Sequence, residues 1–150
     1  MDSWCLLCSG AEGIEDKGNI HNFPLRINLN GGSGPTRQEW RQAVRDMVAA
    51  ASKFEPDIVI VHLGLDGLET DLAHVVDNKG RSHLLIEDFD WFGEEVTKAF
   101  EKVVAVLEGG YDIRGWMVSH FALAFSAFVR RLIAAAQPFS ASPEPASTST

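Results

Sequence analysis

The chain has 150 residues, with 13 Lys and Arg against 21 Asp and Glu, which gives a formal net charge of −8. Its 45% hydrophobic and 23% charged content is typical of one soluble globular domain. The acidic balance disfavours nucleic-acid binding, which needs clustered Lys and Arg. No apolar run reaches the roughly 18 residues that cross a bilayer, and no targeting signal is seen. We therefore expect no membrane span and a location in the cytoplasm or the nucleus.

The N-terminal part contains few structural signals. Cys5 and Cys8 form a C-x-x-C, which is at most half of a four-ligand zinc site, so we expect two incidental thiols. A short strand is predicted near Ile20–Phe23, ending before Pro24.

The next two elements have clear boundaries. Thr36 and Glu39 fit a capping box at the start of a helix that extends to Lys53. The helix carries one apolar stripe, formed by Trp40, Ala43, Val44, Met47, Val48 and Ala51. Residues 57–63 (DIVIVHL) follow Pro56 and predict a buried strand.

The second half repeats this alternation. A helix is predicted to begin near Asp88, with apolar residues as far as Phe100 on one side, and residues 102–107 (KVVAVL) predict another buried strand. Asp112 is expected to cap a third helix, with Trp116, Met117, Phe121, Ala124, Phe125, Phe128 and Leu132 on its apolar side. The Pro/Ser/Thr-rich residues 137–150 predict a disordered tail.

Strands that alternate with helices imply parallel pairing through right-handed crossovers. Both central strands are apolar at nearly every position, which is typical of strands covered on both faces. The sequence therefore predicts an α/β fold, with a mainly parallel sheet in a three-layer α/β/α arrangement.

Unusual residues follow the two central strands. The first strand is followed by Gly64–Leu65–Asp66–Gly67, and the second by Glu108–Gly109–Gly110–Tyr111. In open α/β sheets, ligands bind beyond the carboxyl ends of the strands. A carboxylate can ligate a metal or transfer a proton, and a Tyr hydroxyl can stabilise an oxyanion. Both segments could equally be ordinary turns, because Asp and Gly favour turns.

Several segments, in this order and spacing, resemble a known family. They are 18–25 (GNIHNFPL), 54–61 (FEPDIVIV), Gly64–Leu65–Asp66, Asp71 five residues after Asp66, 84–92, and 107–111 (LEGGY). Together they are similar to the C-terminal part of the zinc-dependent histone deacetylase family, which includes acetoin-utilisation and acetylpolyamine deacetylase-like proteins. The resemblance covers residues 13–136, which leaves a non-matching leader, 1–12, and the tail.

The resemblance implies a fold, a reaction and site residues. The fold would be the C-terminal portion of an arginase/deacetylase-like domain. The reaction would be zinc-dependent hydrolysis of acetyl-lysine or a related acylated amine. Asp66 would be a zinc ligand, Tyr111 would bind the acyl carbonyl, and Gly109 and Gly110 would border the substrate channel. His62 and Leu65 are further candidates for the pocket wall.

Other parts of the family site are missing. A catalytic zinc usually has three protein ligands, and the family takes two from an Asp-x-His motif and its acid/base groups from a His-His dyad. Neither motif occurs among the five histidines, which are His21, His62, His74, His83 and His120. We therefore expect a partial domain that binds zinc weakly and does not catalyse hydrolysis alone.

Two features allow alternative interpretations. His62 could be a packed core histidine instead of a pocket residue. Glu69, Asp71, His74 and Asp77 could form a separate metal site, although such acidic residues are usually solvated loop residues.

Three hypotheses follow for the function. The first is a truncated deacetylase chain, and the second is a non-catalytic binding or regulatory module with the same fold. The third, a phosphate binder at Gly109–Gly110, is disfavoured because Tyr follows the glycines where Lys or Ser would be needed. A partial sheet would also expose an edge strand, so we expect self-association or the binding of a missing N-terminal segment.

Overall fold

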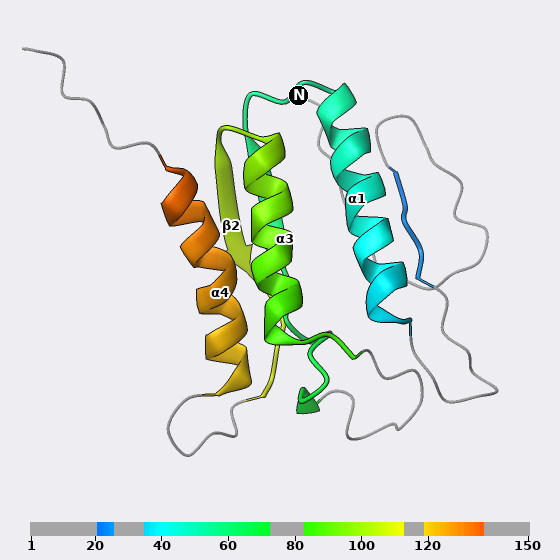
Figure 1. The fold of residues 1–150 in the computed structure, drawn as a ribbon, viewed down its shortest axis with the longest axis vertical. Helices are drawn as coiled ribbons and strands as arrows, with labels where there is room; N and C mark the ends of the chain where they lie inside the picture. Colours follow the sequence, from blue (N-terminus) through cyan, green and yellow to red (C-terminus); the bar gives the residue numbers. More distant parts are fainter. Residues whose placement is uncertain (1–20, 26–34, 73–82, 113–118, 137–150) are drawn as a thin grey trace, which may run out of the picture.

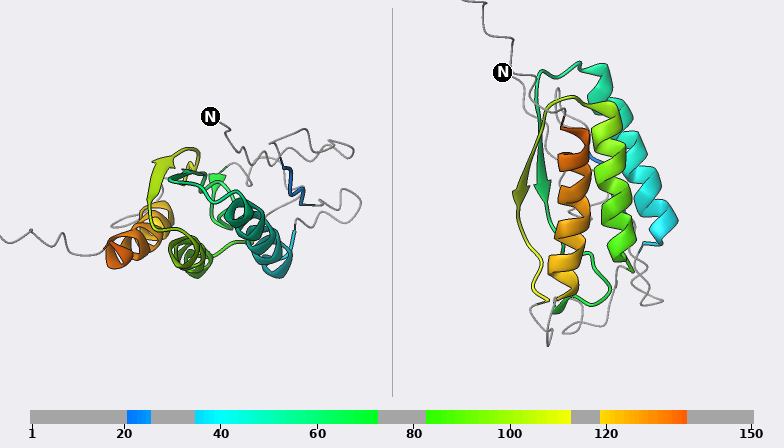
Figure 2. Two further views of the ribbon diagram at one scale, coloured as in Figure 1. Left: turned by 90° about the horizontal axis from the view of Figure 1, so that it is seen from above. Right: turned by 60° about the vertical axis from the view of Figure 1, so that its left-hand side comes forward.

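The computed structural model describes residues 21–25, 35–72, 83–112 and 119–136. Three helices lie along one side of two strands (Figures 1 and 2). In chain order the elements are α1 (Arg37–Lys53), β1 (Val59–Leu63), α3 (Ile86–Ala99), β2 (Val103–Leu107) and α4 (His120–Ala135). None of the helices in these ranges is long and apolar enough to cross a membrane.

β1 and β2 pair in parallel, in a register that runs from Val59 opposite Val103 to Leu63 opposite Leu107. Parallel neighbours need a crossover connection, which here contains α3. The predicted α/β fold with a parallel sheet is therefore confirmed.

The two faces of the sheet differ in exposure. Val61, Leu63, Val103 and Ala105 point toward the helices and join a core with residues such as Phe89 and Phe128. Ile60 and Val104 pair on the other face and are 56% and 44% exposed. In the described ranges, helices cover one face of the sheet only. Burial on both faces, which the apolar sequence of the strands predicts, is therefore not observed there.

The start of α1 agrees with its predicted capping box. The Thr36 hydroxyl accepts from the Glu39 N–H at 3.2 Å, and the Thr36 N–H donates to the Glu39 carboxylate at 2.7 Å. Trp40, on the predicted apolar stripe, lies 6.0 Å from Phe89 and 5.8 Å from Phe92 between ring centroids. This aromatic cluster joins α1 to α3.

α3 begins at Ile86, close to the predicted start near Asp88, and Asp88 lies at its third position. Its carboxylate is fully buried and accepts from the Leu85 N–H at 2.9 Å. Arg37 and Arg41 each approach it to 2.6 Å. Burial alone would raise the pKa of Asp88, but the hydrogen bonds from Arg37, Leu85 and Arg41 outweigh burial and lower it. Its bond to the N–H of Leu85, the residue before the helix, stabilises the first turn of α3.

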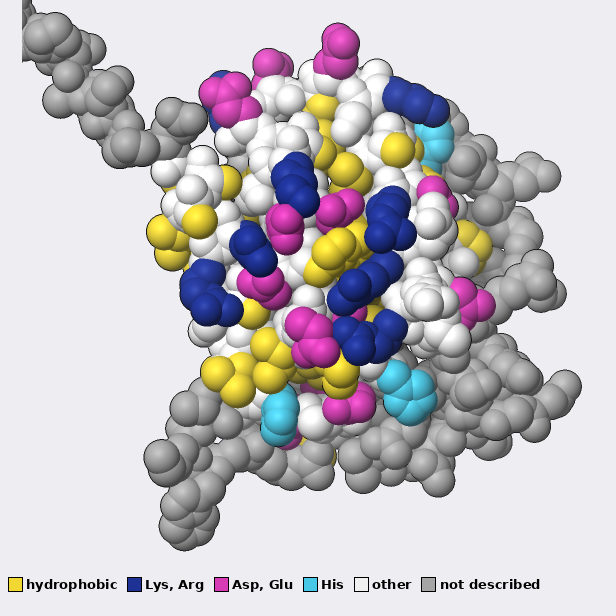
Figure 3. Space-filling view, in the orientation of Figure 1, with side chains coloured by type: hydrophobic (Ala, Val, Ile, Leu, Met, Phe, Trp, Pro, Cys, Tyr) yellow, Lys and Arg dark blue, Asp and Glu magenta, His cyan; other side chains and the backbone are white. Residues whose placement is uncertain are grey.

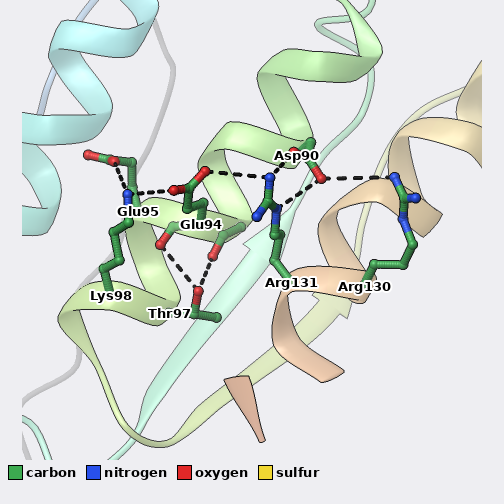
Figure 4. A network of polar contacts seen from close by, with 8 residues as sticks. Asp90, Glu94, Glu95, Thr97, Lys98, Arg130 and Arg131 are labelled. Atoms are coloured by element: carbon green, nitrogen blue, oxygen red, sulfur yellow. Dashed lines mark hydrogen bonds and ion pairs between the residues drawn. The ribbon is translucent and has the colours of Figure 1, made fainter. Parts of the chain in front are cut away.

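α3 and α4 pack closely around Gly93. A Cβ at that position would lie 2.9 Å from the Phe128 carbonyl oxygen of α4. Beside this contact, Arg131 binds Asp90 at 2.5 Å and reaches Glu94 at 3.5 Å (Figure 4). The hydrogen bond from Arg131 is the main cause that lowers the pKa of Asp90. Basic and acidic side chains are intermixed on this side of the molecule (Figure 3), as is typical of a solvated surface.

Other predictions need correction. Ser119 is the N-cap of α4, where its hydroxyl accepts from the Ala122 N–H at 3.2 Å, so Asp112 does not cap the helix. Residues 21–25 contain no strand, so the predicted strand near Ile20–Phe23 is not found in its described part. Predictions for Cys5, Cys8, Ile20, Trp116, Met117, the leader and the tail fall outside the described residues.

Candidate functional site

The segments after β1 and β2 stay together beyond the sheet. The Glu108 N–H donates to the Leu63 carbonyl at 2.9 Å, and the Leu65 N–H to the Gly109 carbonyl at 3.5 Å. The two strand ends that the sequence singled out thus form one contiguous surface, because parallel strands end at the same edge.

Asp66 lies against the Gly109 backbone. Gly109 has a φ of +69°, and a Cβ placed there would be 3.3 Å from both Cγ and Oδ2 of Asp66. The exposed Asp66 side chain therefore occupies the space that a larger residue at position 109 would need. Gly64 is similarly confined, since its Cβ would lie 3.0 Å from the Asp66 Oδ1.

Gly110 is enclosed on the opposite side. It has a φ of +103°, and a Cβ would lie 2.7 Å from the Phe121 ring and 2.9 Å from the Leu65 Cβ. Leu65 is fully buried, so it supports the loop from the core and does not face an open cavity. Phe121 of α4 and Leu65, in the segment after β1, together confine the backbone of the loop at Gly110.

Asp71 reaches the same loop from below. Two successive turns, closed by hydrogen bonds from Leu68 to Leu65 and from Asp71 to Leu68, bring it there. Its carboxylate is fully buried and accepts from the N–H groups of Tyr111 at 2.5 Å and Asp112 at 3.1 Å. The expectation of a solvated loop residue is therefore wrong for Asp71.

Tyr111 points its side chain outward. The residue is 58% exposed, and its hydroxyl has no hydrogen-bond partner in the part of the chain that the structure describes. Asp112, the next residue, is 2% exposed, and its carboxylate lies 4.0 Å from the His120 imidazole. A phenol with an available O–H thus projects from a backbone that is held underneath.

His62 lies on the exposed face of the sheet. Its side chain is 62% exposed, and its Nδ1 lies 2.8 Å from the Glu108 carboxylate. It is therefore not a core histidine. The sequence could not show this, because a strand residue faces the core or the solvent according to which face is covered.

The described residues do not fit a zinc ion by themselves. They contain no group of three His, Cys, Asp or Glu side chains that could hold a metal. Asp66, which the family resemblance predicts as a zinc ligand, lies at the strand ends without a second predicted ligand among the described residues. For the possible separate metal site, His74 and Asp77 lie outside the described residues.

Two shallow hollows occur elsewhere on the molecule. One, of about 550 Å³, lies between α3 and α4 and includes Asp90 and Arg131. The other, of about 410 Å³, lies between residues 22–25 and α1. Neither of these two hollows is lined by Asp66 or Tyr111.

The fold and the strand-end residues define a parallel α/β protein with a polar site at the carboxyl edge of its sheet. The sequence profile of the histone deacetylase domain matches residues 8–126, and the chain belongs to this family. A comparison with curated proteins finds no match. The matched range begins before the predicted boundary at 13 and ends within α4, so the boundaries 13 and 136 stay predictions.

Proposed function

We propose that this chain contributes the Asp66 and Tyr111 side of a deacetylase-like site for an acylated amine, such as acetyl-lysine. One observation carries the proposal. The Asp66 carboxylate packs against Gly109, two residues before Tyr111, so a carboxylate and an available phenol share the carboxyl edge of the sheet. Family membership supports the same substrate class.

Tyr111 would act on the acyl carbonyl. Its O–H would donate a hydrogen bond to the carbonyl oxygen, and this bond strengthens as water adds and the oxygen becomes negative. Gly109 and Gly110 would line the approach to the phenol, because glycine lets a substrate chain lie close to the backbone.

The chain supplies too few groups for hydrolysis by its own residues. The family is zinc-dependent in general, but the five histidines include neither an adjacent pair nor an Asp-x-His. A catalytic zinc usually needs three protein ligands. We infer that further ligands and an acid/base pair would have to come from another polypeptide segment.

A peptide-binding experiment tests this proposal. The full chain is titrated with an acetyl-lysine peptide and with the same peptide unacetylated, and binding is followed by calorimetry. We expect preference for the acetylated peptide and an affinity loss of roughly 2- to 12-fold in Tyr111→Phe, the value of one hydrogen bond. Equal binding of both peptides would contradict acyl recognition.

A zinc titration tests the competence of the chain. We expect no tight stoichiometric binding and no release of acetate from the peptide when zinc is added. Tight binding that is lost in Asp66→Ala would show that the chain completes a site, which would overturn this part of the proposal.

The alternative function is a non-catalytic binding or regulatory module. The absence of the two histidine motifs from the sequence favours it. Acetyl-peptide binding that persists in Tyr111→Phe and Asp66→Ala would support binding through another surface and would favour this alternative.

The further partners and the compartment are also proposals. The predicted exposed sheet edge could pair with a second copy of the chain or with a complementary segment, and a location in the cytoplasm or the nucleus stays a prediction.

A further inference from the structure

Asp71 is a buried carboxylate beside the proposed site that the proposed substrate chemistry does not use. It is fully buried, although it binds the backbone of the exposed Tyr111, which lies forty residues later in the chain. A buried carboxylate is costly unless hydrogen bonds compensate it. The N–H groups of Tyr111 and Asp112 provide two of these bonds through a single oxygen, Oδ2.

Asp71 contacts Tyr111 through the Tyr111 backbone. Tyr111 is 58% exposed, and within the described ranges its hydroxyl binds no other residue. Gly110 before it has a positive φ and fits between Phe121 and Leu65. The residue is thus fixed from its main chain and not through its own side chain.

We propose that Asp71 is a positioning residue, whose buried carboxylate fixes the Tyr111 backbone and thereby aims the phenol at the acyl carbonyl. The aim at a carbonyl rests on the proposed function, whereas the anchoring of Tyr111 does not. Charge-assisted hydrogen bonds are short and strong, so a carboxylate is well suited to hold two adjacent N–H groups.

The chain contains one tyrosine, which gives a direct probe. Labelling with ¹⁵N-tyrosine gives one amide signal, and 3-fluorotyrosine gives one ¹⁹F signal, both from Tyr111. We expect Asp71→Ala to speed exchange of the Tyr111 amide by roughly tenfold or more, as for the loss of a hydrogen bond to a charged group. The ¹⁹F signal should move toward that of free 3-fluorotyrosine.

Three further variants separate positioning from general destabilisation. Asp71→Asn keeps an oxygen acceptor, so it should retain most of the wild-type ¹⁹F displacement. Val44→Ala removes core volume from α1 and should lower the melting temperature without moving either Tyr111 signal. Glu69→Gln, at an exposed position in the same loop, should leave both signals unchanged.

Unchanged Tyr111 signals in Asp71→Ala, or equal changes in Val44→Ala, would overturn the proposal. If Asp71→Ala does not fold, Asp71→Asn decides, because a neutral amide is a weaker acceptor and should shift the Tyr111 amide proton upfield. An unshifted proton would then refute the anchoring.

The acetyl-lysine peptide supplies the functional readout. We expect Asp71→Ala, or Asp71→Asn where alanine does not fold, to weaken binding of the acetylated peptide with little effect on the unacetylated one. If the wild-type chain binds neither peptide, the proposed function fails, while the two spectroscopic signals still decide whether Asp71 positions Tyr111.

Discussion

The glycines before Tyr111 both have positive φ, but their surroundings differ. Gly109, at +69°, faces the exposed carboxylate of Asp66, whereas Gly110, at +103°, faces the Phe121 ring and Leu65. An exposed side chain can move aside, but a packed core cannot without cost. Alanine at position 109 therefore tests backbone strain, whereas alanine at position 110 adds overpacking of the core to that strain.

Gly110→Ala should destabilise the chain by about 2–4 kcal/mol, because it adds both unfavourable φ and a clash with the core. Gly109→Ala should cost about 1 kcal/mol, since its φ is in the left-handed region and its neighbour can shift. Urea unfolding of both variants measures the difference. Equal costs would show that the core does not confine Gly110.

Asp88 is a second residue whose environment makes a prediction. Its pKa in the folded protein lies below the ordinary value of 3.8. A lowered folded pKa means that its contribution to stability is present above pH 3.8 and is lost as the pH falls through the folded pKa. Acid should therefore weaken the link between α1 and α3.

Asp88→Asn should lower stability at neutral pH by about 2–4 kcal/mol, because it removes the charge that faces Arg37 and Arg41. The gap between wild type and variant should narrow as the pH falls below 3.8 and through the lowered pKa of Asp88. Thermal unfolding across this pH range measures it. Glu87→Gln, at an exposed partner of Arg37, should change stability by about 0.5 kcal/mol or less, and a constant Asp88→Asn gap would contradict the linkage.

The packing of α3 against α4 determines whether a side chain larger than hydrogen fits at Gly93. In isolation, glycine weakens a helix by about 1 kcal/mol relative to alanine. Here a Cβ would meet the Phe128 carbonyl at 2.9 Å and the Arg131 Cβ at 3.0 Å. The close approach of the helices therefore opposes the local propensity.

Gly93→Ala should destabilise the chain by about 1–2 kcal/mol, the overpacking cost minus the gain in helix propensity. Ser126→Ala, at an exposed position of α4, tests propensity alone and should be neutral or stabilise by about 0.5 kcal/mol. Chemical unfolding of both variants distinguishes the cost of overpacking from the gain in helix propensity. Stabilisation by Gly93→Ala would show that α4 can move away.

At the scale of the whole molecule, the exposed face of the sheet is the feature that predicts self-association. Ile58, Ile60, Val104 and Val106 are between 41% and 56% exposed. Grouped apolar residues on a surface favour association with another surface. The helix side, by contrast, carries intermixed charges (Figure 3).

We expect the purified chain to self-associate with rising concentration, as measured by light scattering after size-exclusion chromatography. The double variant Ile60→Thr with Val104→Thr should shift it toward monomer, because it makes the centre of this face polar. Ile133→Thr, on α4 and 68% exposed, is the matched control and should have little effect. A wild-type chain that stays monomeric at every concentration would contradict the prediction.

The sequence predicted the described helices and central strands well, because their signals are local. The Thr36–Glu39 capping box, the spacing of Trp40 and Val44, and the β-branched residues 59–61 each depend on near neighbours in the chain. The placement of Asp66 and the Gly109–Tyr111 segment at one edge also followed from parallel pairing. The start of α4 was wrong because both Asp112 and Ser119 can serve as caps.

What the sequence determined by itself is thus the order of the elements, the class of fold and the family motifs at the strand ends. Only the tertiary structure shows that Asp71 is buried against the Tyr111 backbone, that His62 faces outward and that Gly93 lets α4 pack close to α3. These properties depend on residues that are distant in sequence, such as the forty positions between Asp71 and Tyr111. Burial is set by what packs above a residue, and local patterns do not contain that information.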